Sequence, residues 1–176
     1  MAEQGGNLPR WPLALWDGGF MVGSPAHIVV AEAMVKGLGN FEEDALLKVA
    51  VEDAMGRTEP PYGGRPDIEL YDSRGYYAAD EVASSVSWTQ EAALADHALS
   101  QVAPDSEDRD WLKERAGWWR NLYDTELGYF HGRNADGSFV EMSSDGAWLD
   151  DFSEGNARHY LWGVPHDPEG LFELLG

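Results

Sequence analysis

Glu154 is the residue whose surroundings in this sequence best suit acid–base chemistry. It lies in DDFSEGNARHYLWGVPHD, residues 150–167, with Phe152, Tyr160 and Trp162 nearby. Glycoside hydrolysis uses one carboxylic acid to protonate the leaving oxygen and a second carboxylate as base or nucleophile. Apolar neighbours raise the pKa of such an acid, so that it keeps its proton near neutral pH. Residues 151–154 also fit a helix-capping pattern, and the pattern alone favours capping over catalysis.

Two further polar positions allow two interpretations each. Asp17 stands beside Trp16 in ALWDGGFMVG, where it could line a sugar pocket or form an ordinary Asp-Gly turn. His166 and Asp167 could form a polar pair at a pocket rim. Asp167 is better explained as a helix cap, because proline follows it. The turn is the favoured interpretation for Asp17, and the helix cap is the favoured interpretation for Asp167.

Three more acidic positions give weaker signals. Glu91 and Asp96 share a predicted helix, and we interpret them as a solvated or hydrogen-bonded face. Residues 134–137, Asn-Ala-Asp-Gly, resemble a fragment of a calcium loop. They lack the earlier acids and the final glutamate that an EF-hand needs, so they predict a turn.

Composition excludes several function classes. The chain has 176 residues, with 12 basic against 32 acidic side chains and a formal net charge of −20. This charge argues against binding to nucleic acid or to anionic membrane surfaces. The absence of cysteine excludes disulfides, thiol nucleophiles and thiolate metal sites. No apolar run reaches the length of about 20 residues that a membrane helix needs. MAEQGGNLPRW does not fit a signal peptide, and the compartment stays open.

Aromatic residues are unusually frequent. Eight tryptophans occur in the chain, several times ordinary usage. A tryptophan face can fill a core or lie against the C–H face of a sugar ring. Composition does not decide between these uses.

The hydrophobic pattern predicts an all-α chain of helices joined by ordered loops. Caps are expected at Ser24, at Asn40 with Glu43, and at Ser87 with Gln90. We expect Trp111 and Trp118 to be buried together. Helices are predicted over 24–39, 41–56, 84–103 and 106–124 and from about 153 and 167, with an aromatic loop over 57–80 and a short β-hairpin near 129–141. Long aromatic loops between paired helices favour an α-hairpin array or toroid over a simple bundle.

Five segments taken together resemble glycoside hydrolase family 92, the exo-acting α-mannosidases. They are LPRWPLA, MVGSPAHIVVAEAMVKGL, SVSWTQEAALADHALSQVA, WRNLYDTELGYFHGRNADGSFVE and FSEGNARHYLWGVPHDPEGLFELLG. They run in the family's order and span nearly the whole chain. The pieces RNADGS and EGN…Y…VPHD…GL are the most specific.

The resemblance implies a fold, a chemistry and a general acid. The fold is an (α/α)6 toroid, of which residues 1–176 would form a fragment within one catalytic domain with no internal boundary. The chemistry is calcium-dependent, inverting hydrolysis of terminal α-linked mannose, with α-1,2 linkage expected. The glutamate before Gly-Asn is the family's general acid and matches Glu154, which reverses the preference for capping. Family members are often secreted or periplasmic.

The resemblance also implies that several parts of the catalytic site lie outside residues 1–176. The family's general base follows in a motif well downstream of Gly176, and the calcium ligands and a β-sandwich domain are likewise expected outside these residues. We expect none of Asp17, Asp151 and Asp167 to be the base. No metal ligand is predicted within the chain. The remainder of the catalytic domain would be its partner.

Two stretches depart from the family pattern at positions that face the mannose site. Arg158-His159 replaces the usual Trp-Gln after Gly-Asn-Ala, and residues 15–20 replace an Asn-containing stretch before Met-Val-Gly. The predicted substrate-binding residues are Trp16, Asp17, Asn156 and His159, beside the catalytic Glu154. The prediction is therefore a partial α-mannosidase that carries the acid but not the base. A non-catalytic helical carbohydrate-binding or interaction module is the alternative.

Overall fold

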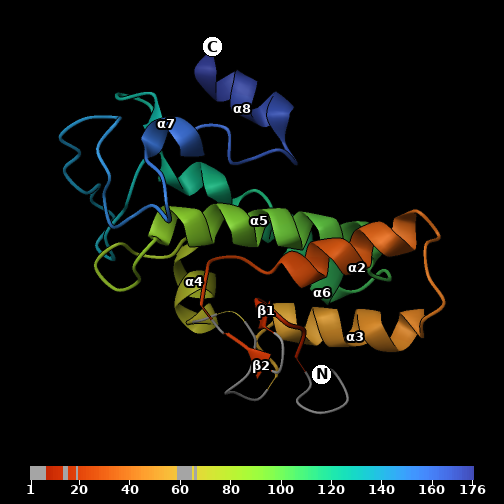
Figure 1. Cartoon of the computed structure of the whole chain (residues 1–176). Coiled ribbons are helices and arrows are strands. Elements are labelled where there is room, and N and C mark those ends of the chain that lie inside the picture. Colours follow the sequence, from red (N-terminus) through yellow and green to blue (C-terminus); the bar gives the residue numbers. More distant parts are fainter. Residues whose placement is uncertain (1–6, 14–15, 19, 59–64, 66) are drawn as a thin grey trace.

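The computed structural model describes residues 7–13, 16–18, 20–58, 65 and 67–176. Helices dominate this part of the chain, and α5 (Ser85–Val102) runs through its middle (Figure 1). Three helices pack against α5: α2 (Pro25–Val35), α3 (Glu43–Ala54) and α6 (Glu107–Arg115). On the other side of α5 in this view lie α7 (Ala157–Tyr160) and α8 (Pro168–Leu175). The predicted all-α fold of packed helices is confirmed.

The apolar core is divided by α5. One cluster fills the space between α2, α3, α5 and α6 and includes Leu47, Leu99 and Leu112. A second gathers beneath the C-terminal loops around Trp119 and Phe130, with ring centroids 5.7 Å apart, and a third, smaller cluster contains Tyr71 and Tyr77. Because α5 contains no glycine or proline, its backbone is unbroken between the first two clusters.

Two helix starts follow the sequence signals. The N-cap Asp167 accepts a hydrogen bond from the backbone N–H of Gly170 at 3.0 Å, with Pro168 as the first residue of α8. At the start of α6, Ser106 Oγ accepts from the N–H of Arg109, and acids fill the first turn. Ser24 precedes α2 as predicted, but its hydroxyl makes no capping hydrogen bond.

Two predicted capping boxes are wrong. Helix α3 begins at Glu43, past Asn40, because the chain still turns at Gly39, where φ is +139°. Ser87 and Gln90 lie inside α5 and are buried. Here the backbone N–H groups of Ser84 and Val86 donate to the carbonyls of Asp150 and Asp151. These contacts satisfy N–H groups that a local side-chain cap would otherwise serve.

One short helix forms where the sequence predicted a loop. The predicted loop over 57–80 contains α4 (Ile68–Arg74), which ends at Gly75 with φ +78°. Seven residues are too few to show a helical period. The aromatic residues that predicted order, Tyr71, Tyr76 and Tyr77, are buried, and Tyr62 lies outside the described residues.

The predicted helix over 106–124 is broken after α6. It continues as a short 3-10 helix, η1 (Trp118–Leu122), beyond Gly117. The rings of Trp111 and Trp118 meet edge to face at 5.4 Å as expected, but both are only partly buried. Trp119 is the tryptophan that fills the core.

Two short antiparallel hairpins complete the structure. The first, β1 (Pro12–Leu13) with β2 (Trp16–Asp17), was not predicted. The second pairs β3 (Tyr123–Asp124) with β4 (Tyr129–Phe130), earlier than the expected strands, because Asp124 Oδ1 accepts backbone N–H groups that close a turn. The turn at 134–137 is confirmed and flanked by a single bridge, Arg133–Phe139.

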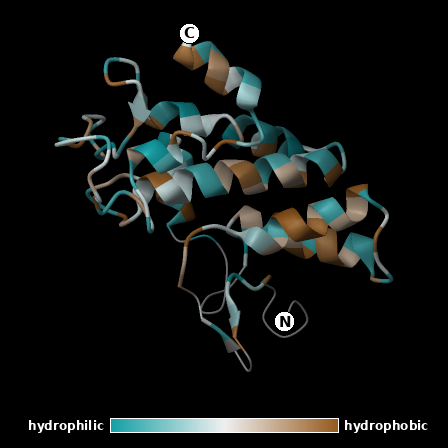
Figure 2. Cartoon of the chain, turned by 45° about the horizontal axis from the view of Figure 1, so that its top comes forward, coloured by the Kyte–Doolittle hydropathy of each residue, from teal (hydrophilic) through white to brown (hydrophobic). Residues whose placement is uncertain are grey.

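The surface keeps several apolar side chains. Figure 2 shows hydrophobic residues on α8, which projects from the rest of the described chain at the C-terminus. Phe172 and Leu175 of this helix are exposed, as are Val29 and Val35 of α2. Within the described residues, no helix combines the length and apolar character needed to span a membrane.

Candidate active site

Glu154 lies in an exposed turn just before α7, and its backbone is left-handed. Its φ is +53°, one of four such values among the described non-glycine residues. A left-handed conformation costs an L-residue about 1–2 kcal/mol, so surrounding contacts must hold it. The turn that contains Glu154 is therefore imposed by the fold.

The capping interpretation of Glu154 is wrong. Asn156 is the N-cap of α7, and its side-chain oxygen accepts from the N–H groups of Arg158 and His159 at 3.1 and 3.4 Å. His159 Nδ1 accepts in return from the N–H of Asn156 at 3.3 Å. Glu154 precedes this box and stands outside it. Its carboxyl group is left for another role.

Contacts with α5 and α7 hold the residues around Glu154. The backbone N–H of Ser153 donates to Ser87 Oγ at 2.8 Å. The Tyr160 hydroxyl donates to the Ser153 carbonyl at 2.7 Å. Both backbone groups of the residue before Glu154 are thus tied to packed helices, which supplies the constraint that the strained turn needs.

The aromatic neighbours of Glu154 divide between core and surface. Phe152 is buried and packs on Tyr160, with ring centroids 5.3 Å apart. Trp162 and Trp148 are 62% and 70% exposed. Within the described residues, Glu154 itself is exposed, so this chain does not supply the apolar enclosure expected from its sequence neighbours.

Sequence reasoning missed the association of Glu91 with this site. Glu91 lies one turn after Ser87 on α5, and burial raises its pKa. Burial also raises the pKa of Tyr160, and the charges of Glu91 and Glu154 add to the shift. Ser87, which holds the residue before Glu154, and Glu91 share one face of α5. The spacing of Ser87 and Glu91 was the only signal for this in the sequence.

Asp17 makes the turn contacts that its sequence favoured. Its carboxylate accepts from the backbone N–H groups of Arg10 and Trp11 at 3.0 and 2.7 Å and closes the β1–β2 hairpin. Trp16 pairs with Leu13 in the same hairpin. Among the described residues, no hydrogen bond joins Asp17 to Glu154.

Asp151 and Asp167, the other aspartates considered as possible bases, are both held in contacts that stabilise the fold. Asp151 is buried, and burial raises its pKa. Its carboxyl group packs against Gly132, where an added Cβ would lie 2.5 Å from it. Asp167 caps α8 and also accepts from Arg120 Nη2 at 2.5 Å. His166 Nε2 lies 3.0 Å from the Ala116 carbonyl oxygen.

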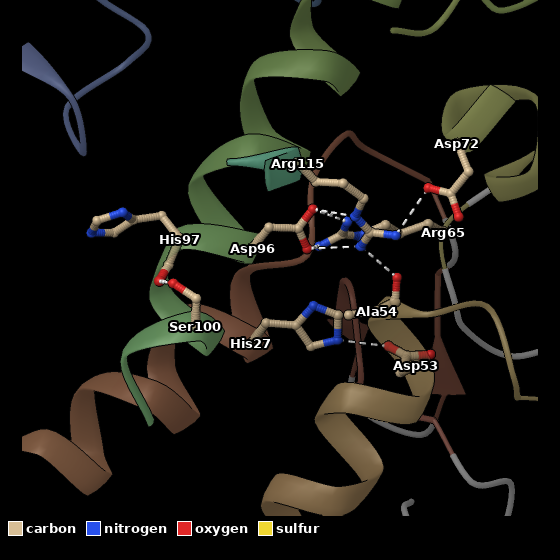
Figure 3. Close-up of polar contacts among 9 residues, drawn as sticks. All are labelled: His27, Asp53, Ala54, Arg65, Asp72, Asp96, His97, Ser100 and Arg115. Carbon is tan, nitrogen blue, oxygen red and sulfur yellow. Dashed lines mark hydrogen bonds and ion pairs between the residues drawn. The ribbon is translucent and has the colours of Figure 1, made fainter. Parts of the chain in front are cut away.

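A buried ion-pair network fixes α5 against its neighbours (Figure 3). Asp96 accepts from Arg65 Nη1 at 2.8 Å and from Arg115 Nε and Nη2 at 2.8 and 2.9 Å. Arg115 also donates to Asp72 and to the Ala54 carbonyl. Burial alone would raise the pKa of Asp96, but the two guanidinium groups outweigh it and hold the pKa below its ordinary value. The helix that carries Ser87 and Glu91 is thereby anchored.

The calcium implied by the family resemblance has no matching ligand set in the part of the chain described. No group of three or more His, Cys, Asp or Glu side chains there is arranged to hold a metal ion. These residues do not fit a calcium site by themselves, and we derive no catalytic step through the ion.

Comparison with solved structures defines the class of protein. Over 98% of its length the chain matches the family GH92 inverting mannosidase BT2199 from Bacteroides thetaiotaomicron, with a TM-score of 0.89 and 27% identity. It matches the α-mannosidase BT3965 from the same organism over 97% of its length, with a TM-score of 0.87 and 28% identity. The fold is that of a segment of a glycoside hydrolase.

The family follows from the sequence. Residues 1–176 match the glycosyl hydrolase family 92 catalytic domain, and the chain belongs to this family. It is also 26% identical, over 97% of its length, to an uncharacterized secreted glycosidase of Arthroderma benhamiae. The resemblance drawn from the five sequence segments is confirmed.

The chain is much shorter than these relatives. It covers 27% of the Arthroderma protein, 24% of BT2199 and 23% of BT3965. It therefore spans about a quarter of each, as the sequence segments predicted.

Proposed function

We propose that residues 1–176 are part of a single family 92 catalytic domain, without an internal boundary, that hydrolyses terminal α-linked mannose. Glu154 is its general acid, and the general base lies outside this chain. The expected substrate is a mannose-containing glycan, with α-1,2 linkage. Any calcium that the complete domain binds would be held by ligands outside these residues.

In this mechanism Glu154 gives its proton to the glycosidic oxygen as the bond to the anomeric carbon breaks. The carboxylate outside the chain removes a proton from water, which attacks the opposite face and inverts the anomeric centre. Carboxyl groups of inverting enzymes stand about 6.5–9.5 Å apart, which leaves room for that water. Enclosure by the rest of the domain would exclude water from the carboxyl group of Glu154.

The observation that carries the proposal is the constrained backbone of Glu154. Its φ of +53° is held by two hydrogen bonds to the preceding residue, and its side chain is exposed rather than used in a cap. Strain of this kind is concentrated at functional sites. The names of the relatives support the same chemistry, since one is an inverting mannosidase and BT3965 has been solved with mannoimidazole.

The predicted substrate-binding residues contribute in different ways. Asn156 is buried as the cap of α7, so its role is to position the turn of Glu154 and His159. His159 is exposed and is proposed to contact sugar hydroxyl groups directly. Trp16 and Asp17 are proposed to approach the site from the β1–β2 hairpin.

One observation favours the alternative of a non-catalytic carbohydrate-binding module. Trp148 and Trp162 are exposed near Glu154 in sequence, and exposed tryptophan faces suit sugar rings. Such a module would bind mannose without turnover.

The test uses a parent enzyme, defined as residues 1–176 within a complete family 92 catalytic domain. This is either the natural domain or a chimera in which these residues replace the matching segment of BT2199. We expect hydrolysis of an α-1,2-linked mannobioside with β-mannose as the first product by NMR. We expect Glu154→Gln to remove at least about 99% of this activity, the range of a general acid. A parent enzyme that binds mannose without hydrolysis would support the alternative.

A further inference from the structure

A half-buried carboxyl group, Glu91, lies between the N-terminal segment and the turn of Glu154. Among the described residues, no cation and no hydrogen-bond donor pairs with it, and burial alone raises its pKa. A half-buried carboxylate usually finds a partner, because desolvation without compensation is costly. In contrast, Asp96 on the same helix is enclosed by two guanidinium groups. Glu91 keeps solvent contact and has no protein partner among the described residues, so its carboxyl group can accept hydrogen bonds from a bound molecule.

The backbone around Gly23 is shaped to fit Glu91. Gly23 has φ +88°, and a Cβ added there would lie 2.7 Å from Glu91 Oε2. Two residues earlier, Met21 has φ +75°, an uncommon value for a residue with a side chain. A side chain at position 23 would have to displace the carboxyl group of Glu91, and the positive φ would add backbone strain.

Contacts on the opposite side join Glu91 to the proposed acid. Ser87, one turn earlier on the same face of α5, accepts from the N–H of Ser153. The Tyr160 hydroxyl donates to the carbonyl of Ser153, and the charges of Glu91 and Glu154 both contribute to its raised pKa. Ser87 and Glu91 thus lie on the face of α5 that holds the residue before Glu154.

We propose that Glu91 is a second carboxyl group of the glycan site, which accepts hydrogen bonds from sugar hydroxyl groups beside Glu154. This inference rests on the proposed function and assigns Glu91 to substrate binding. The chemistry fits, because a carboxylate is an acceptor only and a sugar ring presents adjacent hydroxyl donors. A bound sugar would supply the donors that Glu91 lacks among the described residues.

The test measures the coupling between Glu91 and one sugar hydroxyl in the parent enzyme. Wild type and Glu91→Ala are compared on α-mannosides in which each ring hydroxyl of the terminal mannose is replaced in turn by hydrogen. We expect Glu91→Ala to lower kcat/KM at least about tenfold, as for a hydrogen bond to a charged group. For one deoxy substrate, the two changes should be non-additive, with little further loss from the second.

Controls separate this role from folding and from the function of Glu154. Glu91→Gln conserves shape, and we expect an intermediate loss with an unchanged melting temperature. Glu114→Gln, at an exposed position of α6, should leave kcat/KM unchanged. Additive losses for every deoxy substrate would overturn the role of Glu91 while the loss in Glu154→Gln still supported the acid. Full activity of Glu154→Gln would overturn the proposed function instead.

Discussion

Glu154 carries an energetic cost that a structural role does not explain. Its carboxyl group caps no helix, yet its backbone adopts a left-handed conformation with φ +53°. Glycine adopts this conformation at no steric cost, so selection for stability alone would favour glycine here. Under the proposed function, glutamate is retained at this position for its side chain.

Replacing Glu154 by glycine is therefore expected to stabilise the chain. Relief of about 1–2 kcal/mol of backbone strain exceeds the added entropy of an unfolded glycine, about 0.5–1 kcal/mol. We predict a rise of up to about 1 kcal/mol in the free energy of unfolding, measured by urea denaturation, together with loss of hydrolysis in the parent enzyme. Glu114→Gly, in the regular helix α6, should instead lower stability by about 1 kcal/mol. Destabilisation by Glu154→Gly would show that the strain argument is wrong.

At the scale of elements, the buried network around Asp96 outweighs the surface ion pairs. Arg115 and Asp96 have side chains that are 0% exposed, and their contacts join α5 and α6 to the end of α3 and to α4. Arg57 makes a comparable two-point contact with Asp108, but it is 45% exposed. Burial is the difference between the two pairs.

We predict that Arg115→Met lowers the free energy of unfolding by about 3–5 kcal/mol, because Asp96 would keep its buried charge with one partner removed. Arg57→Met is the matched control and should cost less than about 1 kcal/mol, because solvent screens its pair. Both values come from chemical denaturation of the 176-residue chain. Equal effects of the two substitutions would contradict the importance of burial.

The contact between α2 and α3 gives a pH dependence of stability. His27 Nε2 lies 2.8 Å from Asp53 Oδ2, and burial lowers the pKa of His27 although Asp53 opposes this. The unfolded chain, with a pKa of about 6.5, therefore binds a proton at higher pH than the folded chain. The contribution of neutral His27 to stability is complete above that pH and decreases as pH falls below it.

We accordingly expect the free energy of unfolding to fall between pH 7 and pH 5, with a slope of at most about 1.4 kcal/mol per pH unit from this one group. His27→Gln keeps an N–H donor but does not titrate, so its slope should be shallower than that of the wild type. The difference between the two slopes isolates His27 from other histidines. Identical slopes would mean that His27 does not titrate differently in the two states.

The element boundaries show which sequence signals are reliable. Asp167-Pro168 predicted its helix start because the capping partner lies within one turn. The start of α5 could not be predicted from Ser87, because the N–H groups of its first turn bond carbonyls more than 60 residues away in sequence. Short α4 was missed because seven residues carry no period. Hydrogen bonds within one helical turn could be predicted from the sequence, whereas hydrogen bonds between distant segments could not.

At the scale of the whole molecule, the family could be predicted from motifs, whereas the shape of the proposed site could not. The segment containing Glu-Gly-Asn identified Glu154 as a candidate by resemblance. Its exposure and strained backbone depend on Ser87 and Tyr160, which lie on separate elements. Glu91 was expected on a solvated or hydrogen-bonded face, and its half-burial without a described partner became visible only in the fold.

The exposure of Glu154 and of apolar side chains on α2 and α8 has a common explanation under the proposed function. Val29, Val35 and Phe172 are each at least 60% exposed. The chain spans about a quarter of the solved relatives, and under the proposed function the rest of its domain would cover these surfaces. The same covering would enclose Glu154 and provide the desolvation that its role requires.

The dependence of rate on the leaving group tests the role of Glu154 most directly. The parent enzyme and its Glu154→Gln variant are compared on an α-mannosyl fluoride, whose leaving group needs little protonation, and on α-1,2-mannobiose, whose leaving group needs it fully. We predict that Glu154→Gln retains turnover of the fluoride within about tenfold and loses turnover of the disaccharide by at least about a hundredfold. Equal losses on both substrates, or full activity on the disaccharide, would contradict proton donation by Glu154.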